Sequence, residues 1–349
     1  MTERENQLRA IRFERPDHIP ILFVIMDSCW DFYPQEAVVE LMETHPLLFP
    51  KERIPTLPHR PNYVPIQRKD KPFVDDWGCT WTTSTNGITG TVTHHPLQNW
   101  ENLKNYRYPD PEVCMGIGPI DWEAERRRIQ TAKAAGKFTS GGLRHGHTFL
   151  QVCDIHGYQE TLFDMEDEEP RLVNLLDKIV EFNEVIVKKY LDMDVDMISY
   201  AEDLGMQTGP MLSPKNFETY FSPLYYRMMK PAVEKGTIIH MHSDGDIRTL
   251  LPYLLQNGVQ IINLQDLVNG LDWIEANIKG KVCIDLDIDR QRITPFGTPQ
   301  QVRDLVKEEI SRLGTRDGGL MLTYGWYPGV PLENIKALMD ALEENMYYV

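Results

Sequence analysis

The sequence predicts an α/β protein that forms a single (β/α)8 barrel of the TIM type, with an N-terminal extension that contains a β-hairpin. From residue 137 onward, strand-like and helix-like segments alternate in units of about 25 to 40 residues, which is typical of parallel βαβ architecture. No Gly-x-Gly-x-x-Gly sequence follows these strands, which disfavours a dinucleotide-binding sheet. We therefore expect one domain over residues 1–349, irregular over residues 1–136 and built of regular βα units over residues 137–349.

The individual elements follow from hydrophobic periodicity. The apolar run at residues 20–25 predicts a buried first strand, and the β-branched residues 80–93 around Asn86-Gly87 predict the hairpin. The later strands are expected at residues 137–140, 196–201, 237–242, 259–264, 282–286 and 320–324. The helices are expected at residues 170–191, from Ser213 past Leu224, and at residues 247–256, 298–313 and 331–342.

The composition is that of an ordinary globular protein, with 42% apolar and 25% charged residues. The chain has 36 Lys and Arg residues and 52 Asp and Glu residues, which gives a formal net charge of −16. This excess of negative charge repels phosphate groups, so we expect neither nucleic acid nor a membrane surface as a partner. The charged N-terminus lacks a signal-peptide core, and the five cysteines have no CxxC spacing. We therefore expect a cytoplasmic protein with reduced thiols.

Polar residues at the ends of the strands are the candidates for the site, because barrel chemistry lies at the C-terminal ends of the strands. Tyr200 and Glu202 share one face of their strand. His240 and His242 share a face of the next strand, and Asp244 follows just beyond. Burying two imidazoles on an apolar strand requires polar partners or a ligand. The candidate metal ligands are Glu202, His240, His242 and Asp244, with Zn²⁺ as the ion, although the spacing also allows proton transfer without a metal.

Other strand ends add further candidates. A loop rich in arginine and histidine follows Gly141-Gly142, and we expect it to face the substrate. Asp287 suits either proton transfer or the binding of loop amides, and Tyr324 closes the last strand. The predicted substrate-binding residues are Arg144, His145, His147, Tyr200 and Asp287. The predicted catalytic residues are Glu202, His242 and Tyr324.

Five segments, taken in this order along the chain, are specific enough to indicate a family. They are Asp75-Asp-Trp-Gly78, Ala201-Glu-Asp-Leu-Gly-Met-Gln207, Leu212-Ser-Pro214, His242-Ser-Asp-Gly-Asp-Ile247 and Tyr324-Gly-Trp-Tyr-Pro-Gly-Val-Pro-Leu-Glu-Asn-Ile335. From about residue 5 to residue 345, the sequence resembles the uroporphyrinogen decarboxylase superfamily. This resemblance implies a (β/α)8 barrel with a funnel-like active site.

Two departures favour one branch of that superfamily over the other. The decarboxylases carry an arginine-rich N-terminal motif that binds substrate carboxylates, whereas residues 25–30 of this chain contain no arginine. Tyr324 stands where the decarboxylases have a histidine. The other branch, the corrinoid-dependent methyltransferases, often holds zinc at positions that match His242, Asp244 and Tyr324, of which this chain retains the histidine.

The sequence therefore predicts a corrinoid-dependent methyltransferase. It would move a methyl group between a small O-methyl or N-methyl substrate and a corrinoid carried by a partner protein. An alkoxide is a poor leaving group, so Zn²⁺ or a proton donor such as His242 or Tyr324 must stabilise the developing charge. One alternative is a decarboxylase of a carboxylated substrate other than uroporphyrinogen, with Arg144 and Arg248 as its cationic residues. A second alternative is a non-catalytic binding protein on the same barrel.

Overall fold

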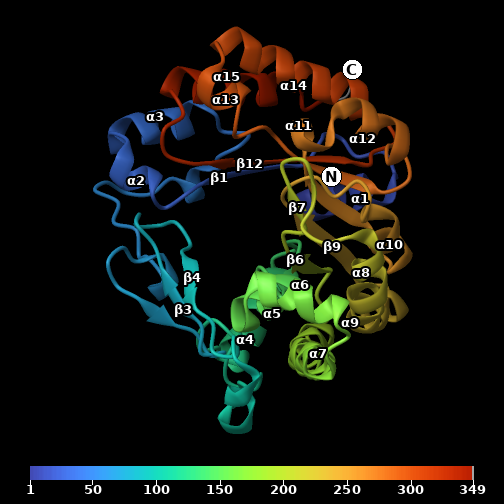
Figure 1. Cartoon of the computed structure of the whole chain (residues 1–349). Coiled ribbons are helices and arrows are strands. Elements are labelled where there is room, and N and C mark those ends of the chain that lie inside the picture. Colours follow the sequence, from blue (N-terminus) through green and yellow to red (C-terminus); the bar gives the residue numbers. More distant parts are fainter. Residues whose placement is uncertain (348–349) are drawn as a thin grey trace. The chain divides into compact units, whose positions relative to one another are not determined.

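The computed structural model describes residues 1–347 (Figure 1). The chain forms two compact units. The first unit comprises residues 1–72, residues 82–90 and the chain from residue 265 onward. The second unit comprises residues 73–81 and 91–264. Parallel strands and helices make up most of both units.

The first unit contains three parallel strands. Strand β12 (Leu320–Trp326) pairs with β1 (Ile21–Ile25) on one edge and with β11 (Cys283–Asp287) on the other. Helices α14 (Pro299–Leu313) and α15 (Leu332–Asn345) pack against each other (Figure 1). Thr298 and Gln301 form a capping box at the start of α14. The remaining helices are α1 (Glu3–Arg12), α2 (Cys29–Phe32), α3 (Gln35–Thr44), α11 (Asp266–Asn269), α12 (Leu271–Asn277) and α13 (Ile293–Phe296), with 3₁₀ turns at Lys51–Arg53 and Pro65–Gln67.

The second unit contains four parallel strands in the order β10-β9-β6-β5. They are β5 (Ser140–Gly142), β6 (Met197–Ala201), β9 (Ile238–Ser243) and β10 (Ile261–Gln265). Two short antiparallel pairs are formed by β2 (Phe73–Val74) with β3 (Thr80–Thr82), and by β7 (Gly205–Met206) with β8 (Gly209–Pro210). The helices are α4 (Trp122–Ala134), α5 (Phe149–His156), α6 (Tyr158–Glu166), α7 (Pro170–Asp192), α8 (Pro214–Asn216), α9 (Ser222–Lys235) and α10 (Leu251–Gln256), with a 3₁₀ turn at Trp100–Asn105.

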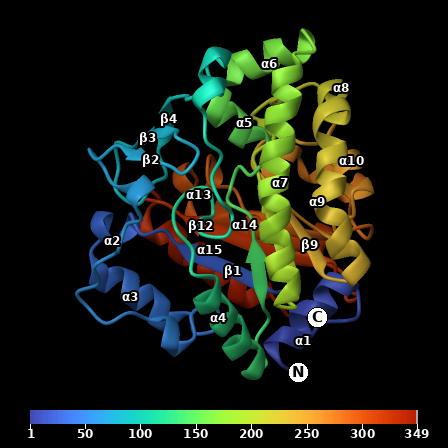
Figure 2. The ribbon, with the colours of Figure 1, turned by 90° about the horizontal axis from the view of Figure 1, so that it is seen from below.

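Amphipathic helices cover the strands of the second unit. The long helix α7 lies alongside α9 (Figure 2). The stripe expected on α7 is buried, as Leu172, Leu176, Ile179 and Ile186 illustrate. The helix expected from Ser213 is found as α8, a π-helical turn at Phe217–Phe221 and then α9.

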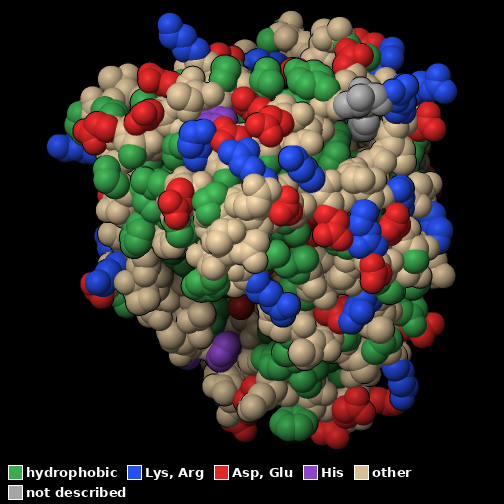
Figure 3. All heavy atoms as spheres, turned by 90° about the horizontal axis from the view of Figure 1, so that it is seen from above, with side chains coloured by type: hydrophobic (Ala, Val, Ile, Leu, Met, Phe, Trp, Pro, Cys, Tyr) green, Lys and Arg blue, Asp and Glu red, His purple; other side chains and the backbone are tan. Residues whose placement is uncertain are grey.

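These pairings confirm an α/β fold with parallel strands. Within residues 1–347, seven strands pair in parallel with a neighbour, three in the first unit and four in the second. Closure into a (β/α)8 barrel stays a prediction. No helix of these residues combines the length and the apolar character needed to cross a bilayer. Acidic and basic side chains are intermixed on the face shown in Figure 3.

The segment around Asn86-Gly87 differs from a tight hairpin. Strand β3 and strand β4 (Thr91–His94) are neighbours in the order β2-β3-β4, but residues 83–90 connect them. The side-chain oxygen of Asn86 instead accepts from Lys69 N at 2.8 Å, and Gly87 N donates to Gln67 O at 2.9 Å. Gly87 has a φ of 79°, and a Cβ there would lie 2.7 Å from Ser28 N. The Asn-Gly pair therefore allows its backbone to lie close to that of Ser28 within the first unit.

A buried acidic pair lies in the first unit. Glu309 of α14 is fully buried, and its carboxyl group interacts with Asp266 of α11, which is also buried. Burial raises the pKa of Glu309 well above its ordinary range, and the neighbouring Asp266 charge raises it further. Glu309 therefore holds its proton to a higher pH in the folded protein than in the unfolded chain.

Glu309→Gln should stabilise the protein increasingly as the pH rises. In the unfolded chain a glutamate ionises near pH 4.3, about its reference pKa. Because native Glu309 resists ionisation, the parent loses stability from about pH 4 up to the native pKa, and a neutral amide avoids this loss. We expect the Tm to rise by several degrees at pH 8 and to change little at pH 4, as measured by circular dichroism. The control is Glu308→Gln, at an exposed position of the same helix. A Glu309→Gln variant with the parental Tm at pH 8 would contradict the account.

Candidate functional site

The pairing of β6 with β9 determines which side chains share a face in the second unit. Ser199 lies opposite His240, and Ala201 lies opposite His242. Since side chains alternate along a strand, Tyr200 points to the other face. On that face, the buried Tyr200 hydroxyl donates to Met228 O of α9 at 3.1 Å. The two histidines and Tyr200 therefore do not belong to one site.

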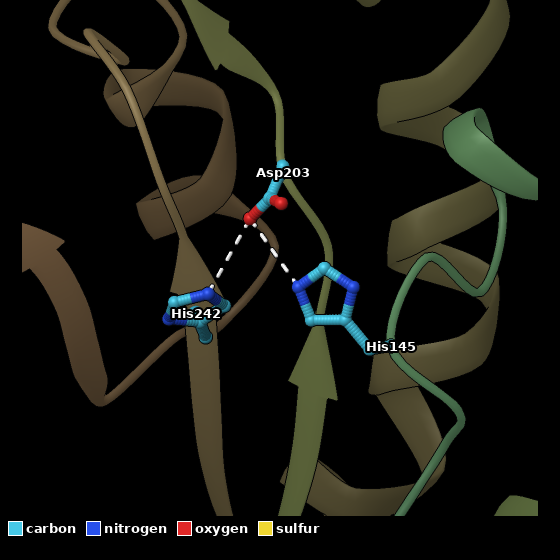
Figure 4. A group of neighbouring side chains, drawn as sticks. All are labelled: His145, Asp203 and His242. Carbon is cyan, nitrogen blue, oxygen red and sulfur yellow. Dashed lines mark ion pairs between the residues drawn. The ribbon is translucent and has the colours of Figure 1, made fainter. Parts of the chain in front are cut away.

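Asp203 lies between two histidines just beyond the end of β6 (Figure 4). Its Oδ1 is 3.4 Å from His242 Nε2 and 3.3 Å from His145 Nε2. One ligand atom from each of these residues lies within 4.8 Å of the others. The side chains of Asp203 and His242 are 29% and 21% exposed, whereas that of His145 is 52% exposed. We refer to His145, Asp203 and His242 as the His–Asp–His cluster.

The loops after β6 and β9 are held together by their backbones. Asp244 N donates to Asp203 Oδ1 at 3.0 Å. Gly205 and Gly245 cross so closely that a Cβ at Gly245 would lie 2.1 Å from the carbonyl carbon of Gly205, and Gly245 has a φ of 80°. Because any side chain would force the loops apart, these glycines keep Asp203 within reach of the β9 histidine.

The cluster is electrostatically polarised. Burial raises the pKa of Asp203, but the hydrogen bonds and charges of His145 and His242 outweigh it and hold that pKa well below its ordinary range. Burial lowers the pKa of His242, yet hydrogen bonds to Asp203 and Asn263 together with the nearby negative charges raise it to about 9. In this arrangement Asp203 is a carboxylate and His242 is an imidazolium at neutral pH.

The donor set of the cluster fits a divalent metal ion. Two imidazole nitrogens and one carboxylate oxygen form a ligand set that suits Zn²⁺ and other first-row ions. Catalytic zinc sites combine three protein ligands with one position open to water or substrate. Within residues 1–347, no other three side chains of His, Cys, Asp or Glu come as close together.

The structure brings only part of the predicted metal set together. His242 is in the cluster, and Asp244 lies at its edge with Oδ1 3.9 Å from His242 Nε2. His240 lies two residues earlier on the same face, where its Nδ1 is 3.1 Å from Ser199 Oγ. His145, which we predicted as a substrate contact, is a member of the cluster.

Glu202, predicted as a catalytic residue and a metal ligand, supports the start of a helix. Its Oε1 accepts from Thr148 N and Leu150 N at 2.8 and 2.9 Å, at the N-terminus of α5. The Tyr225 hydroxyl donates to Oε2. Burial raises the pKa of the fully buried Glu202 to about 8, although these backbone bonds oppose the shift. The structure does not bring Glu202 into the cluster, because its carboxyl group turns to the N-terminus of α5.

Arg144 and His147 are buried on either side of His145. The guanidinium group of Arg144 donates to Asp154 at 3.1 Å and to Gln151 at 2.6 Å, and its Nε donates to His145 O at 3.2 Å. Burial lowers the pKa of His147 to about 3, so its ring is neutral. Both residues support the loop that presents His145.

The remaining predicted residues lie in the first unit. Asp287 pairs with Arg290, with 2.5 Å between Oδ2 and Nη2. Tyr324 is fully buried and packs against Phe23, with 5.2 Å between the ring centroids. Burial raises the pKa of the Tyr324 hydroxyl, so it keeps its proton. Tyr324 therefore occupies a core position.

The sequence analysis missed Asp203 and Asn263. Asp203 stands directly after Glu202, within a segment that carries the family resemblance. Alternation places Tyr200 and Glu202 on one face and Asp203 on the other, and only the pairing of Ala201 with His242 shows which face carries the histidines. Asn263 becomes visible only through the register of β10, which places it opposite His242.

Comparison with known proteins places the chain in a family. Residues 76–345 match the sequence profile described as uroporphyrinogen decarboxylase. The chain belongs to the uroporphyrinogen decarboxylase family. The uroporphyrinogen decarboxylase of Prochlorococcus marinus (strain NATL1A) is 21% identical over 254 residues, which cover 72% of this chain and 70% of that protein. The corresponding protein of Nostoc punctiforme (strain ATCC 29133 / PCC 73102) is 20% identical over 267 residues, or 73% of this chain and 70% of that one.

A solved structure extends the comparison to the fold. A methyltransferase from Methanosarcina mazei has a TM-score of 0.62 and 18% sequence identity, and the match covers 98% of each chain. At this identity, the likeness establishes a shared fold. The chain therefore resembles uroporphyrinogen decarboxylases in sequence and this methyltransferase in fold.

Substitutions at two neighbouring positions of this uroporphyrinogen decarboxylase family member distinguish the role of Asp203 in the cluster from the role of Glu202 at the start of α5. Asp203→Asn should fold and weaken zinc binding by at least about tenfold. Even the loss of a residue outside the first coordination shell typically lowers metal affinity by about that factor. Glu202→Gln should bind zinc like the parent and melt within a few degrees of it. The amide keeps an acceptor for the α5 N–H groups, and Glu202 is already neutral below pH about 8. Calorimetric titration with ZnCl₂ and thermal unfolding measure both effects, and the reverse pattern would refute this assignment.

Proposed function

We propose that this protein is a methyltransferase that moves a methyl group between a small O-methyl or N-methyl substrate and a corrinoid carried by a partner protein. The observation that carries the proposal is the His–Asp–His cluster. It lies at the C-terminal ends of parallel strands, where α/β barrel enzymes place their chemistry. The methyltransferase from Methanosarcina mazei, which shares the fold, supports the same reaction class.

The residues of the cluster suit transfer of a methyl group from a poor leaving group. His145, Asp203 and His242 would hold Zn²⁺, which supplies a Lewis acid for the charge that develops on the leaving oxygen or nitrogen. The anionic Asp203 offsets the charge of the ion. Asp244, at the edge of the cluster, adds a second carboxylate with a 37% exposed side chain. The exposed ring of His145 makes this side of the cluster the accessible one for a small substrate.

The two arginines that a decarboxylase would need are already paired within the chain. Arg144 is 8% exposed and donates to Asp154, and Arg248 lies 2.7 Å from the carboxylate of Asp246. Residues 25–30 contain no arginine. Recognition of substrate carboxylates relies on charge-assisted bonds from cationic side chains. This pairing favours methyl transfer over decarboxylation.

Metal content and methyl transfer to a corrinoid test the proposal. Protein purified without chelator should hold about one zinc per chain, as a three-ligand site implies. It should methylate cob(I)alamin from members of a panel of methoxyphenols and N-methylamines, followed by absorbance. His242→Asn should melt within a few degrees of the parent and slow the transfer roughly a hundredfold or more. His94→Ala, at an exposed histidine of β4, is the matched control and should keep metal and rate.

Two results would overturn the proposal. Metal-free protein that converts uroporphyrinogen to coproporphyrinogen would establish a decarboxylase. Protein that binds methylated compounds without metal and without turnover would establish a non-catalytic binding protein.

A further inference from the structure

We infer that Asn263 is a positioning residue that fixes which ring nitrogen of His242 faces Asp203 and His145, the other two members of the cluster. This inference rests on the proposed metal site. Asn263 lies on β10, opposite His242 of the parallel neighbour β9. Residues paired in this way share a face of the sheet. Asn263 is only 4% exposed, so water competes little for its amide.

The chemistry of the contact determines the state of the imidazole. His242 Nδ1 is hydrogen-bonded to Oδ1 of Asn263. An amide oxygen only accepts hydrogen bonds, so Nδ1 must carry the hydrogen. In the neutral ring the lone pair is then on Nε2, which is the nitrogen that lies 3.4 Å from Asp203 Oδ1. The amide thus selects the tautomer that a metal ion requires at this position.

The same contact fixes the orientation of the ring. Histidine rotates about its last side-chain bond between two broad and nearly equivalent positions. The carboxylates of Asp203 and Asp244 both lie near Nε2, at 3.4 and 3.9 Å. Asn263 binds the opposite edge of the ring, at Nδ1. The polar groups on the two sides therefore allow only one of the two ring orientations.

Zinc affinity is the first test. Asn263→Leu removes the acceptor with little change in size, and Asn263→Ala removes it with a smaller side chain. Each should weaken zinc binding about 10- to 100-fold, the loss typical of outer-sphere partners of metal ligands. Asn263→Asp retains an acceptor at the same place and should stay within a few-fold of the parent. Competition with a zinc-binding dye measures all four proteins. If the folded Leu or Ala variant binds zinc as the parent does, the inference is wrong.

The ring proton of His242 gives a readout that a purely structural role would not change. In metal-free protein with ¹⁵N-labelled histidine, the Nδ1–H signal of His242 should be protected from solvent exchange, and His242→Asn assigns it. This protection should be lost in Asn263→Ala and kept in Asn263→Asp. Protection that survives in Asn263→Ala would overturn the inference. Parent protein that binds no zinc but shows the protected signal would instead overturn the proposed function and leave the positioning role established.

Discussion

The parallel register between β6 and β9 is the constraint on which the candidate site depends. Because Ala201 lies opposite His242, the chain leaves β6 directly beside the histidine, and Asp203 follows two residues later. A register shift of one residue would exchange the two faces of the strand. The crossing of Gly205 and Gly245 then keeps both loops in contact beyond the strands. Backbone pairing therefore brings the members of the cluster together, and their side-chain interactions depend on it.

Two adjacent carboxyl groups behave in opposite ways because of this arrangement. Glu202 turns to the helix layer, where burial raises its pKa to about 8 and it joins the start of α5 to Tyr225. Asp203 turns to two imidazoles that hold its pKa well below the ordinary range. The first carboxyl supports the fold, and the second is available as a ligand. Because of this separation, we expect a substitution at one position to leave the role of the other intact.

The sequence predicts the elements better than it predicts the contacts between them. The strand at residues 237–242, the long helix at residues 170–191 and the position of His242 near a strand end all follow from local periodicity, and the structure confirms them within one or two residues. The face to which Glu202 turns and the pairing of His242 with Asn263 depend on inter-strand register, which no local pattern contains. A turn does form at Asn86-Gly87, where Ile88 N donates to Thr85 O, but it lies within the longer connection of residues 83–90. The contact of Gly87 with Gln67, which is distant in sequence, could not be predicted from a local pattern.

The central claim is that two histidines and Asp203 form a metal site without sulfur. The five cysteines, Cys29, Cys79, Cys114, Cys153 and Cys283, are free and buried, and none belongs to the cluster. X-ray absorption fine structure of the zinc-loaded protein tests this claim most directly. We expect nitrogen and oxygen neighbours at about 2.0 to 2.2 Å, with outer-shell scattering from two imidazoles. A sulfur neighbour at about 2.3 Å, or a first shell without imidazole, would contradict it.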